Sequence, residues 1–161
     1  MTDAASLSGI HHVALNVGDV EQSARWYQEV LGFVPLFPYD TDHFERRIVR
    51  HPSGVVLGLT RHRHPDAATP FSERRPGLDH LAFAVDDRSV LDAWAQRLTN
   101  AGVEHSGVKV TPTTGSALVA FRDPNGIQLE VYAAQGATAG GTTVASSLQR
   151  SVKRGEGDVS T

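Results

Sequence analysis

The sequence predicts an α+β fold built from two tandem βαβββ modules. The main observation is an internal repeat, because residues 9–15 (GIHHVAL) return as residues 77–83 (GLDHLAF). A second pair of segments, 51–59 and 122–131, recurs in the same order and at the same spacing. Repeats of this kind indicate that each copy forms one structural unit. A chain of 161 residues is long enough for two small modules that share a pocket.

The first module is predicted over residues 9–61. Alternating side chains predict a strand at 10–17. Asp19 is expected to cap a helix, with Gln22 at capping-box spacing, and Gly32 is expected to end it. Turn residues then separate three further predicted strands. These strands cover 33–39, 43–51 and 54–61.

The second module, residues 77–134, repeats this order. A strand is predicted at 78–85 and a helix at 88–101, with apolar residues at helical spacing. Trp26 and Trp94 occupy matching helix positions, which supports the register of the repeat. The last three strands are predicted at 103–110, 116–122 and 126–133.

Three segments lie outside the predicted modules. Residues 1–8 form an N-terminal extension. Residues 62–76 contain three prolines and no periodicity, which is typical of a surface linker. Residues 135–161 are rich in Gly, Thr, Ser and charge and contain few large apolar side chains. Such a composition does not bury enough surface to offset the entropy of ordering, so a disordered tail is predicted.

The composition is ordinary for a soluble globular protein. With 40% hydrophobic residues, 20% charged residues and a net charge of −3, it gives no reason to expect nucleic acid as a partner. No apolar stretch approaches the roughly 20 residues that span a bilayer, so no membrane association is expected. There is no secretory leader pattern, and cytoplasmic localisation is the default expectation. The absence of cysteine excludes disulfides and thiolate sites.

Candidate metal ligands follow from strand alternation. His12 and its repeat counterpart His80 are both expected on the sheet face opposite their helix. Glu130 is expected on that face of the last strand, whereas its first-module counterpart is Gly58. Two imidazoles and one carboxylate can hold a divalent ion and leave positions open for substrate. We therefore predict His12, His80 and Glu130 as metal ligands. The donor set suits Zn, Ni, Co, Mn and Fe(II) alike.

Other residues of the predicted face suggest further roles. Asn16, Gln128 and Tyr132 share it and are predicted to hydrogen-bond a substrate. Glu130 is also the predicted catalytic residue, moving a proton, since no other carboxylate is evident there. His11 neighbours His12 but is expected on the opposite face. Small side chains on the concave face leave room for an organic substrate of some bulk. These are Ala14, Gly58, Ala82, Ala84 and Ala120.

The chain resembles the vicinal oxygen chelate superfamily in three features. These are the two repeated modules, the H-x-x-x-x-V-x-D pattern of residues 12–19 and the segment FRDPNGIQLE of residues 121–130. The resemblance covers residues 9–134, and D-P-N-G-x-x-x-E is its most specific part. The superfamily includes glyoxalase I, fosfomycin-resistance enzymes, extradiol dioxygenases, methylmalonyl-CoA epimerase and bleomycin-binding proteins. It implies metal ligands on the first and last strands of the modules, at His12, His80 and Glu130. It also implies a homodimer whose sites are built within one chain or across subunits.

The chain lacks one or more residues that are typical of glyoxalase I, the epimerases, the fosfomycin enzymes and the extradiol dioxygenases. Glyoxalase I and the epimerases use a Glu or Gln ligand where this chain has Gly58. Fosfomycin enzymes and extradiol dioxygenases carry a Tyr that residues 116–121 lack, and fosfomycin enzymes have a Thr in place of Ala14. The leading interpretation is a glyoxalase-like, metal-dependent enzyme of the lyase, isomerase or transferase type that acts on a small organic molecule. Two alternatives stay open: a metal-free drug- or metabolite-binding protein and an Fe(II) extradiol-type dioxygenase.

Overall fold

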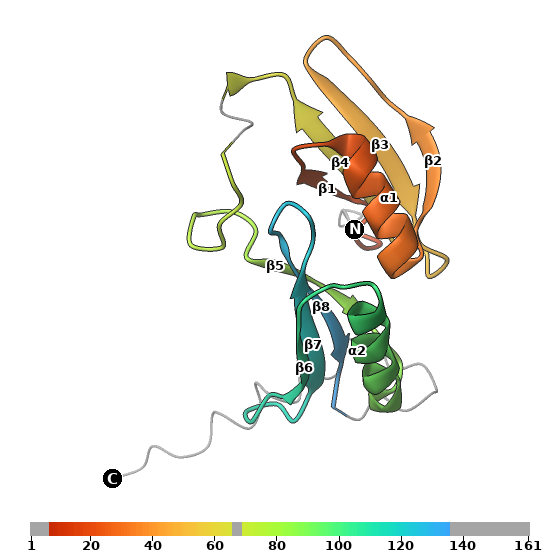
Figure 1. Cartoon of the computed structure of the whole chain (residues 1–161), viewed down its shortest axis with the longest axis vertical. Coiled ribbons are helices and arrows are strands. Elements are labelled where there is room, and N and C mark those ends of the chain that lie inside the picture. Colours follow the sequence, from red (N-terminus) through yellow and green to blue (C-terminus); the bar gives the residue numbers. More distant parts are fainter. Residues whose placement is uncertain (1–6, 66–68, 136–161) are drawn as a thin grey trace, which may run out of the picture. The chain divides into compact units, whose positions relative to one another are not determined.

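A computed structural model describes residues 7–65 and 69–135. The chain divides into two compact units at the boundary between Pro70 and Phe71, which falls inside the predicted linker. Each unit contains one four-stranded mixed sheet and one main helix (Figure 1). The predicted α+β fold of two βαβββ modules is confirmed. Residues 136–161 of the predicted tail 135–161 lie outside the described residues.

The first unit follows the predicted order βαβββ. Its sheet has the strand order β1-β4-β3-β2, with β1 parallel to β4 and the other pairs antiparallel. The strand predicted from residue 10 begins at Val13, because pairing with β4 starts at the Val13–Leu57 pair. The elements are β1 (Val13–Asn16), α1 (Val20–Leu31), β2 (Val34–Pro38), β3 (Phe44–Arg50) and β4 (Val56–His62).

Helix α1 begins and ends where the sequence indicates. The Asp19 carboxylate accepts a hydrogen bond from the Gln22 backbone N–H at 2.8 Å, which caps the first turn. This bond also lowers the pKa of Asp19. Gly32 ends the helix in the left-handed conformation at φ 82°, which costs glycine little. The apolar face of α1 packs on β3 and β4. Tyr27, Leu57 and Leu59 are completely buried there.

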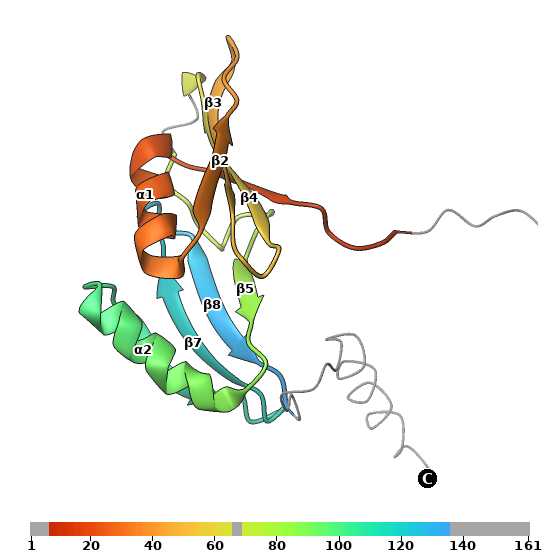
Figure 2. The ribbon, with the colours of Figure 1, turned by 90° about the vertical axis from the view of Figure 1, so that its right-hand side faces the viewer.

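The second unit repeats this arrangement. Its sheet has the order β5-β8-β7-β6, with β5 parallel to β8. Helix α2 covers one face of this sheet, contacting β6, β7 and β8 (Figure 2). The predicted helix 88–101 is split, since its first turn is a 3₁₀ helix. The elements are β5 (His80–Ala84), η2 (Arg88–Val90), α2 (Leu91–Asn100), β6 (His105–Val110), β7 (Ala117–Arg122) and β8 (Gln128–Ala133).

The D-P-N-G segment is the turn between β7 and β8. The buried Asp123 carboxylate accepts hydrogen bonds from the N–H groups of Asn125 at 2.8 Å and Ile127 at 2.9 Å. Gly126 has φ 81°, in the left-handed region that this turn requires. In the first unit the His51 ring nitrogen accepts from the Ser53 N–H at 3.1 Å in the corresponding turn. These turns set the register of the strands that follow them.

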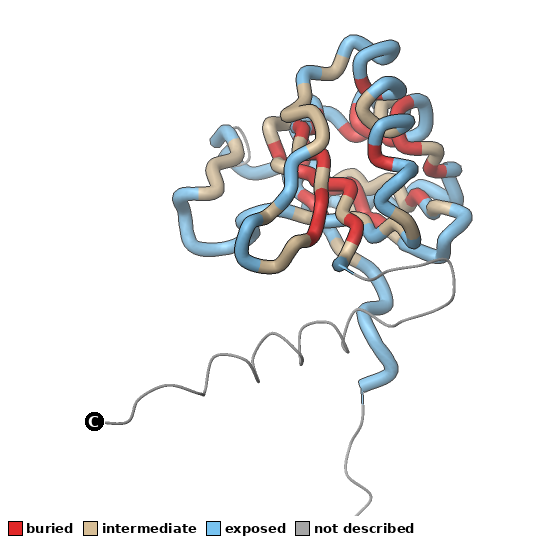
Figure 3. Tube along the Cα trace, turned by 90° about the horizontal axis from the view of Figure 1, so that it is seen from below, coloured by how far each residue is buried: buried red, intermediate tan, exposed pale blue. Residues whose placement is uncertain are grey.

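More buried and more exposed residues alternate along β1, β5 and β7, whereas β4 is buried on both faces from Leu57 to Thr60. Figure 3 shows how burial varies along the chain. Each sheet packs its own helix on one face. The edge strand β2 exposes several large apolar side chains. These are Val34, Leu36 and Phe37, with Tyr39 just beyond the strand. Neither α1 nor α2 is long and apolar enough to cross a bilayer.

Part of the predicted linker belongs to the second unit. Glu73 forms an ion pair with Arg122 of β7, with 3.0 Å between Oε1 and Nη2. The Arg122 side chain also donates to the Gly126 carbonyl at 2.6 Å, which ties this segment to the β7–β8 turn. Residues 71–73 are partly buried, consistent with a segment that packs against the sheet.

Candidate functional site

The face of the second sheet opposite α2 carries the candidate residues of that unit. Ala82 pairs with Glu130, which pairs in turn with Ala120, so the three side chains form one row across β5, β8 and β7. Along β5 the residues of this face are exposed, whereas Leu81 and Phe83, under the helix, are half-buried. Alternation in β5 and β8 therefore places His80 and Glu130 on one face, as predicted.

His80 and Glu130 approach each other on this face. Their closest atoms, Nε2 of His80 and Oε2 of Glu130, are 3.7 Å apart. The Glu130 side chain is 12% exposed and the His80 side chain 41%. The Glu130 carboxylate is thus largely withdrawn from water at the base of the site, while the imidazole lies nearer its surface.

Asp79 determines the orientation of the His80 ring. Its Oδ1 lies 2.5 Å from His80 Nδ1. A carboxylate can only accept here, so Nδ1 carries the proton and donates it, and in the neutral ring Nε2 keeps its lone pair. Histidines that bind metals almost always donate their other N–H in this way. Nε2, the ring nitrogen that keeps its lone pair, is consequently the one near Glu130.

This pair fits a divalent metal ion. Two donor atoms that each lie about 2.0–2.2 Å from one metal ion are roughly 3.0–3.5 Å from each other. The observed distance of 3.7 Å between His80 Nε2 and Glu130 Oε2 is slightly longer. A small side-chain rotation closes that difference. The nitrogen and oxygen donors also match the chemistry of Zn, Mn, Ni, Co and Fe(II). Within the described residues, however, no group of three or more His, Asp or Glu side chains is arranged to hold a metal.

The remaining predicted ligand, His12, belongs to the first unit. It precedes β1 and is exposed, and its Nδ1 lies 2.9 Å from Nδ1 of His11. In the repeat, His11 corresponds to Asp79, so the two histidines have different neighbours. An imidazole can share one proton with another imidazole, but it brings no negative charge to the ligand. The part of His12 in a metal site stays a prediction.

The predicted substrate-binding residues are distributed over both units. Gln128 and Tyr132 are half-buried and lie on the same face of β8 as Glu130. Asn16 is exposed at the end of β1, on the face of the first sheet opposite the buried Leu15. Their roles stay predictions.

The space beside Gly58 is lined by two side chains of β3. Gly58 is buried, and a Cβ atom there would lie 3.4 Å from Arg46 Cδ and 3.6 Å from Ile48 Cδ1, which are ordinary contact distances. The room predicted at Gly58 is therefore bounded by the long side chain of Arg46. Sequence reasoning missed Arg46. Alternation in β3 could have predicted that Arg46 lies on the same face as Gly58. It could not have predicted the path of the Arg46 side chain.

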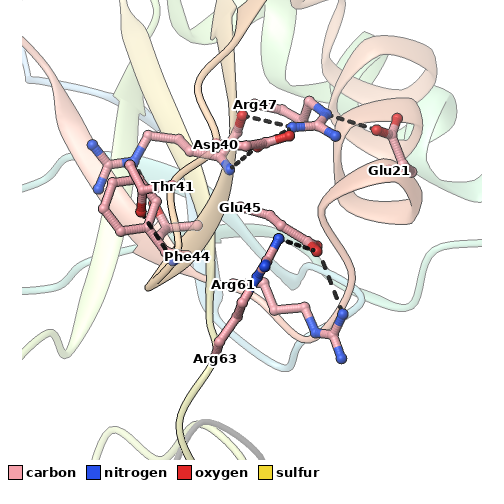
Figure 4. A network of polar contacts seen from close by, with 10 residues as sticks. Glu21, Asp40, Thr41, Phe44, Glu45, Arg47, Arg61 and Arg63 are labelled. Atoms are coloured by element: carbon pink, nitrogen blue, oxygen red, sulfur yellow. Dashed lines mark hydrogen bonds and ion pairs between the residues drawn. The ribbon is translucent and has the colours of Figure 1, made fainter.

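Several other charged residues of the first unit form two clusters of ion pairs. Arg47 Nε lies 2.6 Å from Glu21 and its Nη1 2.7 Å from Asp40, while Glu45 contacts Arg61 and Arg63 (Figure 4). The Arg46 backbone N–H and then the Arg47 guanidinium lower the pKa of Asp40. These contacts stabilise the end of the β2–β3 hairpin rather than a reactive centre.

Comparison with known proteins agrees with this architecture. A family model described as Glyoxalase/Bleomycin resistance protein/Dioxygenase superfamily matches residues 9–131. The crystal structure of a glyoxylase/bleomycin resistance protein/dioxygenase domain from Frankia sp. EAN1pec is 35% identical, with a TM-score of 0.73 over 81% of this chain and 100% of that chain.

Relatives also match in sequence along most of the chain, among them the following two. YwkD of Bacillus subtilis (strain 168) is 32% identical over 130 residues, which is 78% of this chain and 97% of YwkD. The metallothiol transferase FosB of Shouchella clausii (strain KSM-K16) is 30% identical over 128 residues, or 78% of this chain and 80% of FosB.

Proposed function

Because the chain belongs to the Glyoxalase/Bleomycin resistance protein/Dioxygenase superfamily, we propose that it is a metal-dependent enzyme acting on a small organic molecule. The observation that carries this proposal is the arrangement of Asp79, His80 and Glu130. An oriented imidazole faces a largely buried carboxylate across 3.7 Å. The similarity to a metallothiol transferase supports metal dependence.

In this proposal His80 and Glu130 hold the divalent ion, with His12 as the third ligand. A bound ion would supply Lewis-acid chemistry by polarising an oxygen of the substrate. Asp79 would keep Nδ1 of His80 as the donating nitrogen, which leaves the Nε2 lone pair available to bind the ion. Proton transfer would fall to Glu130 after it leaves the metal, or to bound water, and the burial of Glu130 would limit competition from bulk water.

The polar residues of the two sheet faces would bind the substrate. Gln128 and Tyr132 flank Glu130 on β8 and supply amide and hydroxyl groups. Asn16 would add an amide from the first unit. The exposed Ala82 and Ala84 on β5 take little space beside them, which suits an organic substrate. We further propose that the protein is a homodimer, as the family resemblance implies.

Metal analysis tests this proposal most directly. The full chain would be reconstituted in turn with Zn, Mn, Co, Ni and Fe(II), desalted and analysed for metal content. We expect near-stoichiometric metal in the wild type and its loss in His80→Ala. The matched control is His43→Ala, which removes an exposed histidine on the β2–β3 turn. A wild type that retains no metal after reconstitution would contradict the proposal and favour a metal-free binding protein.

The identity of the ion directs the search for the reaction. Retention of iron would lead to oxygen-consumption assays with a catechol, whereas the other ions would direct screening toward Lewis-acid reactions. Once a substrate is found, Glu130→Gln tests proton transfer. A Glu130→Gln variant that binds metal yet turns over at the wild-type rate would refute the catalytic role of Glu130.

A further inference from the structure

A second polar row crosses the first sheet on the face opposite α1. Thr60 of β4 pairs with Asn16 of β1 on one side and with Arg46 of β3 on the other. Paired residues of neighbouring strands project to the same face. Asn16, Thr60 and Arg46 therefore lie side by side on the face that carries Gly58.

The Arg46 side chain is held along the sheet. Its Nε donates a hydrogen bond to Thr60 Oγ1 at 2.8 Å, and Thr60 itself is only 1% exposed. The guanidinium carbon lies 4.5 Å from the centroid of the Phe44 ring, which adds a cation–π contact. Two contacts from different strands thus fix the guanidinium, so little side-chain entropy remains to be lost on binding.

Gly58 lies beneath this path. The Arg46 side chain passes over it, with Cδ 3.4 Å and Nε 3.7 Å from the position of a Cβ atom at residue 58. A Cβ alone would make ordinary contacts, whereas the further carbons of a larger side chain are expected to compete with Arg46 for the same space. Where related enzymes place a Glu or Gln ligand, this chain thus presents a cation that cannot ligate a metal ion.

The outer edge of the guanidinium has no partner in residues 7–65 and 69–135. Arg46 Nη1 and Nη2 make no hydrogen bond or ion pair there, whereas Arg47, Arg61 and Arg63 each contact a carboxylate. The strand positions on this face of the first sheet include no acidic residue. They are Ala14, Asn16, Val34, Phe37, Phe44, Arg46, Ile48, Arg50, Val56, Gly58, Thr60 and His62.

We propose that Arg46, with Asn16 beside it, binds an oxyanion group of the substrate, such as a carboxylate or a phosphate. With Nε committed to Thr60, the Nη1 and Nη2 groups can donate two parallel hydrogen bonds to two oxygens of one anion. The Asn16 amide can donate to the same group. This inference rests on the proposed function and adds that the substrate carries an anionic group.

Anion titration of the EDTA-treated protein tests the site without metal. Acetate and inorganic phosphate would be added at constant ionic strength while the backbone amide resonances of Gly58 and Thr60 are followed by NMR. We expect saturable shifts in the wild type. In Arg46→Met, binding should weaken roughly 10- to 100-fold, the effect of losing a charge-assisted hydrogen-bonded contact.

Arg61→Met is the matched control. It removes the same charge from the opposite face of β4, where Arg61 pairs with Glu45, and it should bind the anions as the wild type does. Equal affinity in Arg46→Met and wild type, or no saturable shift in the wild type, would overturn the proposal. Thermal unfolding of each variant establishes that it is folded.

Gly58→Val tests the site with the charge intact. Gly58 has no positive φ, so valine strains no backbone, but its methyl groups would displace Arg46 from Thr60. We expect anion binding as weak as in Arg46→Met, and wild-type affinity would refute the part assigned to Gly58. Metal retention is measured separately. If the protein binds metal but no anion, only this inference is refuted. If it binds the anion but no metal, only the proposed function is refuted.

Discussion

Asp79 and Glu130 act on opposite nitrogens of the same imidazole. Asp79 lies 2.5 Å from Nδ1 of His80, and Glu130 lies 3.7 Å from Nε2. The first contact fixes the tautomer, and the second places a carboxylate near the nitrogen that keeps its lone pair. Asp79 immediately precedes its histidine on the exposed surface, whereas Glu130 comes from β8, the strand beside β5.

Removing the Asp79 carboxylate should weaken metal binding while both proposed ligands of the second unit remain. In Asp79→Ala we expect roughly 10- to 100-fold lower affinity for a divalent ion, because the His80 ring loses its orientation and some basicity. Isothermal titration calorimetry with Zn measures this. Asp86→Ala, a second exposed aspartate of this unit, is the control for the loss of one charge. Equal affinities for Asp79→Ala and wild type would show that His80 needs no orienting partner.

Substituting His11 and His12 one at a time tests which of these adjacent histidines binds the metal ion. His12→Ala should lower metal affinity at least about tenfold if its imidazole is the third ligand, because one coordinate bond is lost. His11→Ala removes a histidine one position away and should leave metal content unchanged. Elemental analysis of the two variants decides between them. The opposite pattern would assign the ligand role to His11 and refute the strand alternation argument.

The Asp123 turn should contribute substantially to stability. Asp123→Ala leaves the N–H groups of Asn125 and Ile127 without their acceptor in a buried turn. We expect a loss of about 1–3 kcal/mol in the free energy of unfolding, measured by urea denaturation. Asp86→Ala again serves as the control, since that residue is exposed. A change below about 0.5 kcal/mol would mean that water replaces the carboxylate at the turn.

Acid should destabilise the first unit through Asp40. Its pKa is lowered in the folded protein, by the Arg46 backbone N–H first and by Arg47 next. A depressed folded pKa contributes stability at pH values above the unfolded pKa, and that contribution is lost as pH falls through the folded value. The free energy of unfolding should therefore decline below about pH 4, the ordinary range of an aspartic acid.

Asp40→Asn isolates this contribution. The variant should be less stable than wild type at pH 7, and the difference should shrink toward pH 2, as followed by urea denaturation. Asp42→Asn alters an exposed carboxylate of the same turn that makes no polar contact within the described residues. A pH profile of Asp40→Asn parallel to that of wild type would contradict the assignment.

Local pattern was sufficient for much of the fold. The helix cap at Asp19, the helix end at Gly32 and the alternation along β5 and β8 all depend on neighbours within a few residues. Boundaries were less exact where long-range pairing decides them. The first strand begins at Val13 rather than residue 10, because β4 offers its first partner, Leu57, only there.

For the candidate site, the sequence by itself determined which residues share a face. Alternation and the repeat placed His80, Gln128, Glu130 and Tyr132 together, since side-chain direction in a strand depends on position alone. Only the tertiary structure decided the 3.7 Å approach of His80 to Glu130 and the passage of Arg46 over Gly58. Both depend on which residues pair across neighbouring strands. They also depend on side-chain rotamers, which are determined by contacts with residues distant in the sequence. The sequence shows that residue 58 carries no side chain that could bind a metal. Only the structure shows that the Arg46 side chain lies over this position.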